Sequence, residues 1–556
     1  MVAKNYILSK ILILSYSKLG IRDAFISPGS RNTPLVLALS DQKKIRTHNI
    51  IDERSSGYIG LGLSKVNKNP ILIITTSGTA VSNLFPSIVE GYMSCVPMII
   101  LTADRPKKLI NTGSNQTINQ YNIFGHYAKF FDLSRIKHIN ENKVSSIALA
   151  SYKNAMGFSL KNKGPVHLNI PFDLPLYTDK RSKIKLKEPI FSINDTKDKK
   201  NPKKVKFPPL NNFSKPLIIS TDIKDERIVL LAEKYNIPIF MECRGVRFSK
   251  KSKNIISGYE FILKNKVLNP DLILRFGNKP ISNLMNEFID KNKKKVYLVK
   301  EEEVFNDDSK NIISSSMKVL TQEFDKKNPK FSINWLKSII KDEERLKIYF
   351  KSLFKSSKHH EGYIINKIIS YLPKKSNLMI GNSSPIRDLD QFTFNGSLGI
   401  NVFSNRGASG IDGLISSSIG MSMNNKYRNF LILGDISFFY DVSSLINHTN
   451  IVSNLTIFIL NNRGGHIFDR LEGLKKEKKY KEHWLTPINL NIKYLAKAFK
   501  CKYLKIGSNS YKDIKKGIIS YQKLKGIKLI EIDINAEKSL KISQKIDQEV
   551  AAILGI

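Results

Sequence analysis

Short runs of apolar residues recur along the chain, and several are apolar at every position rather than at every second one. In the first 175 residues they are DAFISPG (23–29), IRTHNIIDE (45–53), PILIITTSG (70–78), VPMIILTAD (96–104) and GPVHLNIP (164–171), with amphipathic stretches between them. Strands that are buried on both faces and joined by helices form a parallel sheet with helices on each side. The pattern therefore predicts an α/β domain over 1–178.

The same alternation returns twice. Apolar runs recur over 213–333, where they are KPLIISTD, IPIFMECRG, DLILRFGNKP and KKVYLVK, and again over 350–556, where they are NLMIGNSS, NFLILGD, LTIFILNN and IKLIEIDI. Between the first two patterns, residues 179–212 are rich in Lys and Pro, which is typical of a linker. We expect an α/β fold made of three doubly wound parallel-sheet domains at 1–178, 213–333 and 350–556.

Composition narrows the class of protein. The 556 residues are 41% hydrophobic and 25% charged, as in globular proteins, so a disordered or collagen-like chain is excluded. Three cysteines far apart cannot form a disulfide framework, which indicates a reducing compartment. No apolar run reaches the length of a membrane span. We therefore expect a cytoplasmic protein.

The chain is strongly basic. Lys and Arg number 90 and Asp and Glu number 48, which gives a formal net charge of +42 and raises the alternative of a nucleic-acid-binding protein. Much of the excess is Lys in the polar stretches 178–187, 195–206 and 474–484, as expected of solvated surface. Helix-turn-helix, zinc-finger and RNA-binding aromatic patterns are missing. We expect no nucleic-acid partner.

The strongest local motif joins two strand ends. Gly434, Asp435 and Ile436 follow one apolar run, and 24 residues later Asn461 and Asn462 follow another. Carboxyl ends of parallel strands meet at the ligand crevice, where Asp435, Asn462 and the backbone carbonyl of Gly464 offer hard oxygens to Mg²⁺ or Mn²⁺. Ser437, at the start of the next helix, can offer an N–H group to a phosphate. A helix cap at Asp435 and a simple Asn-Asn turn are the alternatives.

This spacing resembles the thiamine diphosphate signature, although Ile436 stands where a third Gly is usual. Thiamine chemistry needs a carboxyl group that shares a proton with N1′ of the aminopyrimidine, so that the cofactor can lose its C2 proton. Glu53, at the end of the second apolar run, is the candidate. Its rival is Asp52, which also suits the cap of the next helix.

Seven segments together resemble one family of thiamine diphosphate enzymes, the 2-succinyl-5-enolpyruvyl-6-hydroxy-3-cyclohexene-1-carboxylate synthases of menaquinone biosynthesis. They are SPGSRNTPL (27–35), DERSSGYIGLGLSK (52–65), the segment 75–106, NQTINQ (115–120), GNSSPIRDLDQF (381–392), SNRGASGIDGLISSSIGM (404–421) and NNRGGHIF (461–468). The middle of the chain resembles nothing specific. The resemblance implies a transferase that decarboxylates 2-oxoglutarate and joins the product to isochorismate.

The resemblance also implies roles for individual residues. Both substrates are dianions, and arginine binds carboxylates through two parallel hydrogen bonds. The family's substrate positions fall on Ser30, Arg31, Arg105, Gln116, Ser383, Arg387, Arg406 and Phe468. Ile411 matches the apolar residue that supports the bent cofactor, whereas His126 and His466 are not given a role in proton transfer.

The sequence leaves two alternatives open. Asn283 stands where the family has a basic residue, for which Lys279 or Arg275 could substitute. Another thiamine-dependent decarboxylase or carboligase, of the acetohydroxyacid synthase type, would share Glu53, Asp435 and Asn462. The resemblance further implies a homodimer with sites shared between chains, and a tetramer is the alternative.

Overall fold

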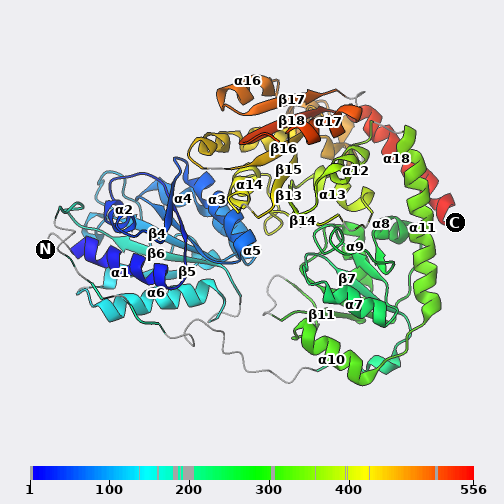
Figure 1. Ribbon diagram of the computed structural model, residues 1–556, viewed down its shortest axis with the longest axis horizontal. Helices are drawn as coiled ribbons and strands as arrows, with labels where there is room; N and C mark the ends of the chain where they lie inside the picture. Colours follow the sequence, from blue (N-terminus) through cyan, green and yellow to red (C-terminus); the bar gives the residue numbers. More distant parts are fainter. Residues whose placement is uncertain are drawn as a thin grey trace. The chain divides into compact units, whose positions relative to one another are not determined.

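The protein is described from a computed structural model (Figure 1). The structure describes residues 4–136, 138–158, 162–179, 184, 186–187, 189–191, 206–301, 307–356, 359–394, 396, 398–424, 426–451, 453–471, 473–507, 511–521 and 523–555. Most of the predicted linker 179–212 lies outside these residues. No helix in the described ranges is both long and apolar enough to cross a membrane.

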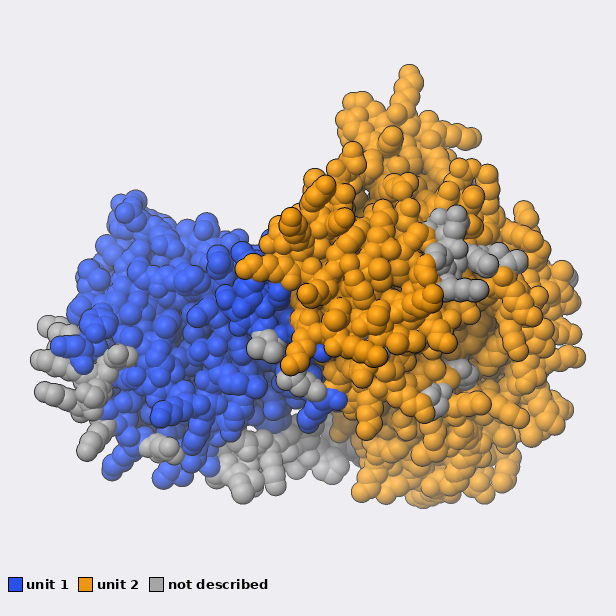
Figure 2. Space-filling model, turned by 45° about the horizontal axis from the view of Figure 1, so that its top comes forward, with its two compact units in different colours: residues 1–201, 405–426, 440–454 blue, residues 202–404, 427–439, 455–556 orange. Residues whose placement is uncertain are grey.

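The chain forms two compact units, coloured separately in Figure 2. The first contains residues 1–201, 405–426 and 440–454, and the second contains residues 202–404, 427–439 and 455–556. The first unit therefore takes two segments from the C-terminal third of the chain.

The first unit is built on a parallel sheet of order β2-β1-β3-β4-β6-β5. Its strands are β1 (Asp23–Ile26), β2 (Arg46–Asn49), β3 (Ile71–Thr75), β4 (Met98–Asp104), β5 (Lys129–Asp132) and β6 (Pro165–Pro171). Helices α1 (Lys4–Lys18), α2 (Thr33–Ser40) and α6 (Glu141–Ala155) cover one face, and α3 (Glu53–Asn67) and α5 (Phe85–Met93) cover the other, while α4 (Thr79–Ser82) follows β3 (Figure 1). Helix α14 (Leu414–Ser422) packs on α3.

The second unit holds two more parallel sheets. The sheet of order β12-β11-β10-β7-β8-β9 comprises β7 (Pro216–Ser220), β8 (Ile239–Met241), β9 (Ile255–Ile256), β10 (Leu272–Phe276), β11 (Val296–Val299) and β12 (Asn311–Ile313). Its helices are α7 (Arg227–Lys234), α8 (Tyr259–Asn265), α9 (Asn283–Lys291) and α10 (Met317–Lys327), after which α11 (Ile333–Ser356) leads onward.

The third sheet has the order β14-β13-β15-β16-β18-β17. It comprises β13 (Ser376–Ile380), β14 (Ile400–Phe403), β15 (Arg428–Gly434), β16 (Leu455–Asn461), β17 (Lys502–Ile506) and β18 (Ile527–Asp533). The helices of this part are α12 (Glu361–Tyr371), α13 (Ser384–Phe392), α15 (Asp435–Tyr440), α16 (Ile492–Ala498), α17 (Tyr511–Tyr521) and α18 (Ala536–Leu554). One apolar core in this unit includes side chains from both of its sheets.

Every strand pair in these sheets is parallel, and strands distant in sequence are neighbours, so the predicted fold class is confirmed. Each apolar run quoted above contains a strand. The domain boundaries at 1–178, 213–333 and 350–556 stay a prediction.

Candidate active site

Asp435 and Asn462 lie at the carboxyl ends of adjacent strands, β15 and β16, which pair up to Gly434 and Leu460. Asp435 is buried, with 4% of its surface exposed. Its Oδ2 accepts a hydrogen bond from the Gly464 N–H at 2.8 Å, and its Oδ1 accepts one from the Ile436 N–H at 2.9 Å. The structure therefore brings the two halves of the predicted motif together at one edge of the sheet.

Burial changes the chemistry of Asp435. It raises the pKa of the carboxyl group to about 6, because removal from water penalises the charged form, although the two backbone N–H donors partly oppose this. Without a cation the carboxylate is therefore poorly compensated. A bound cation would remove that penalty by supplying the missing positive charge.

Within the part of the chain that the structure describes, the side-chain amide of Asn462 is hydrogen-bonded through its nitrogen but not through its oxygen. Its Nδ2 donates to Glu361 Oε1 at 2.9 Å, whereas its buried Oδ1 accepts no hydrogen bond from the described residues. A buried polar atom without a partner is rare in proteins and calls for a ligand or a water molecule. Glu361, at the start of α12, thus fixes which way the amide points, and no motif in the sequence marks it.

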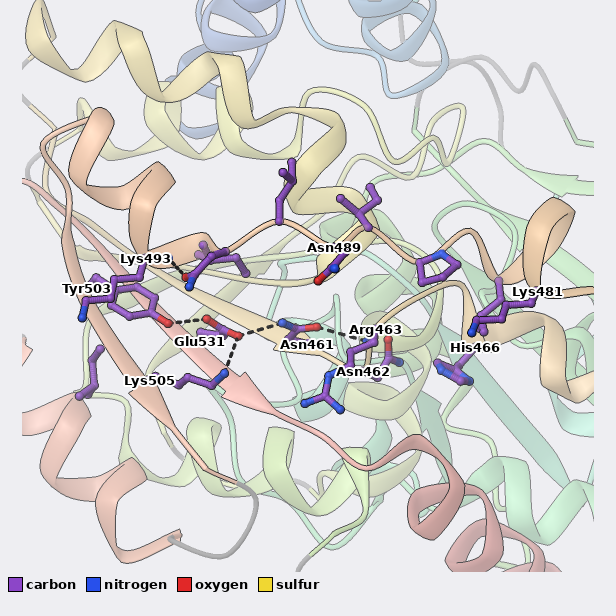
Figure 3. A pocket seen from close by; sticks show the side chains of 17 residues that line it. Asn461, Asn462, Arg463, His466, Lys481, Asn489, Lys493, Tyr503, Lys505 and Glu531 are labelled. Atoms are coloured by element: carbon purple, nitrogen blue, oxygen red, sulfur yellow. Dashed lines mark hydrogen bonds and ion pairs between the residues drawn. The ribbon is translucent and has the colours of Figure 1, made fainter.

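Asn461 and Asn462 also line a cleft of about 1010 Å³ (Figure 3). Glu531 lies in its wall and accepts hydrogen bonds from Asn461 Nδ2 at 2.8 Å and from the Tyr503 hydroxyl at 2.5 Å. This network fixes Asn461, the neighbour of Asn462. The charged side chains that line the cleft are Arg463, Lys481, Lys493, Lys505 and Glu531, so the lining has net positive charge and favours anions.

In the first unit, Asp52 and Glu53 have different surroundings. Asp52 caps α3, because its Oδ1 accepts from the Arg54 N–H at 2.9 Å and its Oδ2 accepts from the Ser55 hydroxyl at 2.8 Å. Glu53 begins the helix, and the only hydrogen bond that its carboxylate accepts from the described residues is a long one, 3.3 Å, from Asn83 Nδ2 to Oε2. The capping role of Asp52 leaves Glu53 as the better placed of the two to meet a ligand.

The predicted substrate residues of the first unit include two arginines with spare donors. Arg31 donates through Nη1 to the Phe172 carbonyl at 2.8 Å, and Arg105 donates through Nη2 to the Asn115 carbonyl at 3.0 Å. The buried Nε of each has no partner among the described residues. Each guanidinium therefore keeps a donor for an anion.

Gln116 and Ser30 are surface positions of the same unit. Gln116 has a backbone φ of 54° and is tied to Ser77, whose carbonyl accepts from Gln116 Nε2 at 3.1 Å. Ser30 is exposed on the turn that precedes α2. The Gln116 amide oxygen and the Ser30 hydroxyl are thus available as polar contacts.

A buried glutamate that the sequence did not single out holds the loop around Arg406. Glu90 Oε1 accepts from Lys65 Nζ and from the Gly407 N–H, at 3.0 and 3.1 Å, and its Oε2 accepts from the Ala408 N–H at 2.8 Å. The sequence signal for this role is weak, namely one acid in the apolar helix FPSIVEGYM.

Ile411 lies on the same stretch of chain as Arg406. The next residue, Asp412, accepts a short hydrogen bond from the hydroxyl of Tyr58 on α3. Ile411 is therefore anchored, through its neighbour, to the helix that Glu53 begins.

Ser383 and Arg387 lie at the start of α13 in the second unit. Ser383 precedes the helix with φ of 73°, and its carbonyl accepts from Arg387 Nη1 at 2.6 Å. Phe468 lies in the short helix His466–Arg470 that follows the Asn-Asn turn. In that helix His466 Nδ1 is 3.0 Å from Asp469 Oδ2, a pairing that suits a structural role.

Asn283, which stands where the family has a basic residue, begins α9. The structure shows how Arg275 and Lys279, the two basic residues that could substitute for it, are placed. Arg275 is 1% exposed and donates to Asp307 and Ser309, so it is already engaged. Lys279 is about half exposed and pairs with Asp308 at 2.8 Å. Of the two candidates, Lys279 is the one that solvent and ligands can reach.

Comparisons with known proteins find two family models that match parts of the chain. Residues 8–123 match the family model of the thiamine pyrophosphate enzyme N-terminal TPP binding domain, and residues 398–532 match that of the C-terminal TPP binding domain. Thiamine pyrophosphate is another name for thiamine diphosphate. Benzoylformate decarboxylase from Polynucleobacter necessarius shares the fold, with a TM-score of 0.68 and 15% identity over 95% of this chain and 98% of that one.

Curated relatives cover nearly the whole chain. Proteins from Oceanobacillus iheyensis and Listeria welshimeri are each 30% identical, over 95% and 96% of this chain and 94% and 95% of their own lengths. One from Bacillus cytotoxicus is 29% identical over 95% of this chain and 94% of its own. All three are named 2-succinyl-5-enolpyruvyl-6-hydroxy-3-cyclohexene-1-carboxylate synthase. The chain belongs to this synthase family of thiamine diphosphate enzymes.

Proposed function

We propose that this protein decarboxylates 2-oxoglutarate and adds the remaining succinic semialdehyde unit to isochorismate, with release of CO₂. The product is the carboxylate after which the relatives are named, an intermediate of menaquinone biosynthesis. The observation that carries the proposal is the likeness to those relatives along nearly the whole chain. Thiamine diphosphate, when bound, supplies the nucleophilic carbon and the electron sink for the decarboxylation.

Mg²⁺ or Mn²⁺ would be held by the Asp435 carboxylate, the Asn462 amide oxygen and the Gly464 carbonyl. The fit rests on the buried Asn462 Oδ1 that accepts no hydrogen bond from the described residues, beside a buried carboxylate. Three oxygen donors from the protein suit a hard cation that takes its other ligands from diphosphate and water. Gly434, at the end of β15, and Ile436 and Ser437, in the first turn of α15, would contact the diphosphate.

Glu53 would share a proton with N1′ of the pyrimidine, and Ile411 would support the ring system from the apolar side. Glu53 suits that role because its neighbour Asp52 already caps α3, which leaves the Glu53 carboxyl group to a ligand. A carboxyl group at hydrogen-bond distance from a ring nitrogen can hold or release one proton.

The two dianionic substrates would be bound by several of the predicted arginines. Arg31 and Arg105 keep a spare buried N–H each, which favours a role in carboxylate binding. Ser30, Gln116, Ser383, Arg387, Arg406 and Phe468 complete the proposed substrate site. We also infer a cytoplasmic homodimer whose chains fold as domains at 1–178, 213–333 and 350–556.

A single incubation tests the function. Purified protein is mixed with thiamine diphosphate, Mg²⁺, 2-oxoglutarate and isochorismate, and the products are read by mass spectrometry. We expect the mass of the joined carboxylate, and we expect it to vanish when isochorismate is omitted. A product formed equally well when pyruvate replaces 2-oxoglutarate would favour the other carboligases instead.

A further inference from the structure

Helix α13 carries the proposed substrate residue Arg387 in its first turn, and Ser383, another proposed substrate residue, directly precedes it. The last turn of the helix is held by a loop of the neighbouring sheet. That loop follows β8 and contains Cys243 and Arg247. All of these residues belong to the second compact unit. The contacts between the loop and the helix centre on one side chain, Asp390, which lies one helical turn after Arg387.

Asp390 is 2% exposed, and three donors surround its carboxylate. Its Oδ1 accepts from Arg247 Nη1 at 3.0 Å and from the Cys243 N–H at 2.6 Å, and its Oδ2 accepts a short hydrogen bond from the Tyr259 hydroxyl. A carboxylate with this many donors is fixed in position and orientation.

Arg247 also binds the backbone at the end of α13. Its Nη2 donates to the Asp390 carbonyl at 2.7 Å and, through a short bond, to the Thr393 carbonyl. The last carbonyls of a helix have no partner within it, and positive charge is favourable there. The fully buried guanidinium therefore serves as a C-terminal cap as well as an ion-pair partner.

The chain after α13 is attached to the same loop. The Leu398 and Gly399 N–H groups both donate to the Phe248 carbonyl at 2.9 Å. At the other end of the helix, Ser383 has a φ of 73°, which an L-residue adopts only when its surroundings enforce it. Helix α13 is thus constrained at both ends, and Arg387 lies between the constraints.

The stability of the fold alone does not explain the buried ion pair between Arg247 and Asp390. Replacing a buried ion pair by apolar residues is often neutral or stabilising, so such a pair adds little to the fold by itself. What Arg247 does supply is a fixed position for the helix, since its planar guanidinium holds the Asp390 carboxylate through Nη1 and the carbonyls of Asp390 and Thr393 through Nη2. Helix α13 is nine residues long and rigid over that length, so its position sets that of Arg387.

We propose that Asp390, Arg247 and Tyr259 are positioning residues for substrate binding, acting through Arg387 by fixing α13. The proposal rests on the function proposed above. The middle part of the chain has no recognisable motif. The proposal gives it a role in substrate binding, because the loop after β8 holds α13 in place.

The test uses Tyr259→Phe, which removes one hydrogen-bond donor and keeps the ring in the core. Leaving a buried carboxylate oxygen without its donor is costly, so α13 should shift or loosen. We expect the KM for the substrate that Arg387 contacts to rise roughly tenfold, with the KM for the other substrate and thiamine diphosphate binding unchanged. Arg247→Lys keeps the charge but loses the forked geometry, and should show the same pattern more strongly.

A double-mutant cycle separates positioning from a general structural effect. In an Arg387→Ala background, Tyr259→Phe should change that KM less than about twofold, because the group it positions is gone. Equal effects in both backgrounds would overturn the proposal. The control is Tyr235→Phe, which removes a similar phenol-to-carboxylate bond, to Asp325, elsewhere in the unit and should leave both KM values unchanged.

A second measurement does not depend on turnover. Hydrogen exchange read by mass spectrometry should speed up in the peptide 384–392 of Tyr259→Phe and stay unchanged there in Tyr235→Phe. Unchanged exchange in Tyr259→Phe would overturn the proposal even if the wild-type protein made no product. Absence of product from the wild type would, in contrast, count against the proposed function alone.

Discussion

The carboxyl group of Asp435 is buried, and burial raises its pKa to about 6. Cofactor binding should therefore depend on pH. Because the cation needs the ionised carboxylate, thiamine diphosphate affinity in the presence of Mg²⁺ should weaken as pH falls through 6 and level off above 7. In Asp435→Asn the affinity should fall by roughly 100-fold or more and lose this pH dependence. Calorimetric titrations between pH 5 and 8 would measure both effects.

The raised pKa of Asp435 also affects the stability of the protein without cofactor. A folded-state pKa raised above the unfolded value of about 4 gives stability that is present below pH 4 and lost as pH rises through 6. Asp435→Asn should therefore stabilise the cofactor-free protein at pH 7, by roughly 1–3 kcal/mol. A lower unfolding temperature for this variant without cofactor would show that the carboxylate is compensated in some other way.

Glu53 and Asp52 can be separated by paired amide substitutions. Glu53→Gln keeps the side-chain shape but cannot share a proton with the pyrimidine, so deuterium exchange at C2 of the bound cofactor should slow by about 100-fold. Asp52→Asn should keep that exchange and at most weaken the α3 cap, at a cost of about 1 kcal/mol or less. Proton NMR of the bound cofactor measures the exchange, and the reverse result would move the role to Asp52.

The residues of the candidate site divide into those that sequence could predict and those that it could not. Asp435 and Asn462 end adjacent parallel strands, so apolar runs and spacing are enough to bring them together. Glu361 and Glu90 act on partners 101 and 317 residues away, Asn462 and Gly407. Such contacts depend on how whole elements pack, and no local pattern records them.

At the level of elements, two helices of the first unit approach so closely that side chains do not fit between them. A Cβ atom added to Gly420 of α14 would lie 1.8 Å from the Ile59 carbonyl oxygen, and one added to Gly62 of α3 would lie 1.9 Å from that of Ser417. This contact places the segment that contains Ile411 against the helix that Glu53 begins.

Gly420→Ala should force these helices apart. Overpacking against backbone costs about 3 kcal/mol or more, so the unfolding temperature should drop by roughly 5 °C or more. The control is Gly164→Ala, since nothing lies within 4 Å of a Cβ at that position. Circular dichroism during heating would measure both variants, and equal melting temperatures would contradict the close packing of α3 and α14.

The strands that the hydrophobic pattern missed share one property. They are β5, β9, β12, β14 and β17, and each lies at an edge of its sheet. An edge strand has one neighbour and more solvent around it, so its sequence needs no long apolar run. The strand β17, KYLKI, shows this, because only its last residue is fully buried. Central strands were predictable because both of their faces are covered.

At the level of the whole molecule, the proposed cofactor contacts are divided between the compact units. Glu53 and Ile411 belong to the first unit, and Asp435 and Asn462 belong to the second. The family resemblance predicts a homodimer in which the pyrimidine is held by one chain and the diphosphate by its partner. In that arrangement Glu53 and Asp435 of one chain serve different sites.

Mixing two inactive variants tests this arrangement. Glu53→Ala and Asp435→Ala chains are unfolded together in equal amounts and refolded, so that random pairing makes half of the dimers mixed. If sites are shared, a mixed dimer has one site with both lesions and one site with neither, and activity should return to about a quarter of the wild-type value. If each site is built within one chain, every site keeps one lesion and the mixture stays inactive. Native mass spectrometry shows whether mixed dimers formed, and their presence without activity would refute the shared site while leaving the roles proposed for Glu53 and Asp435 intact.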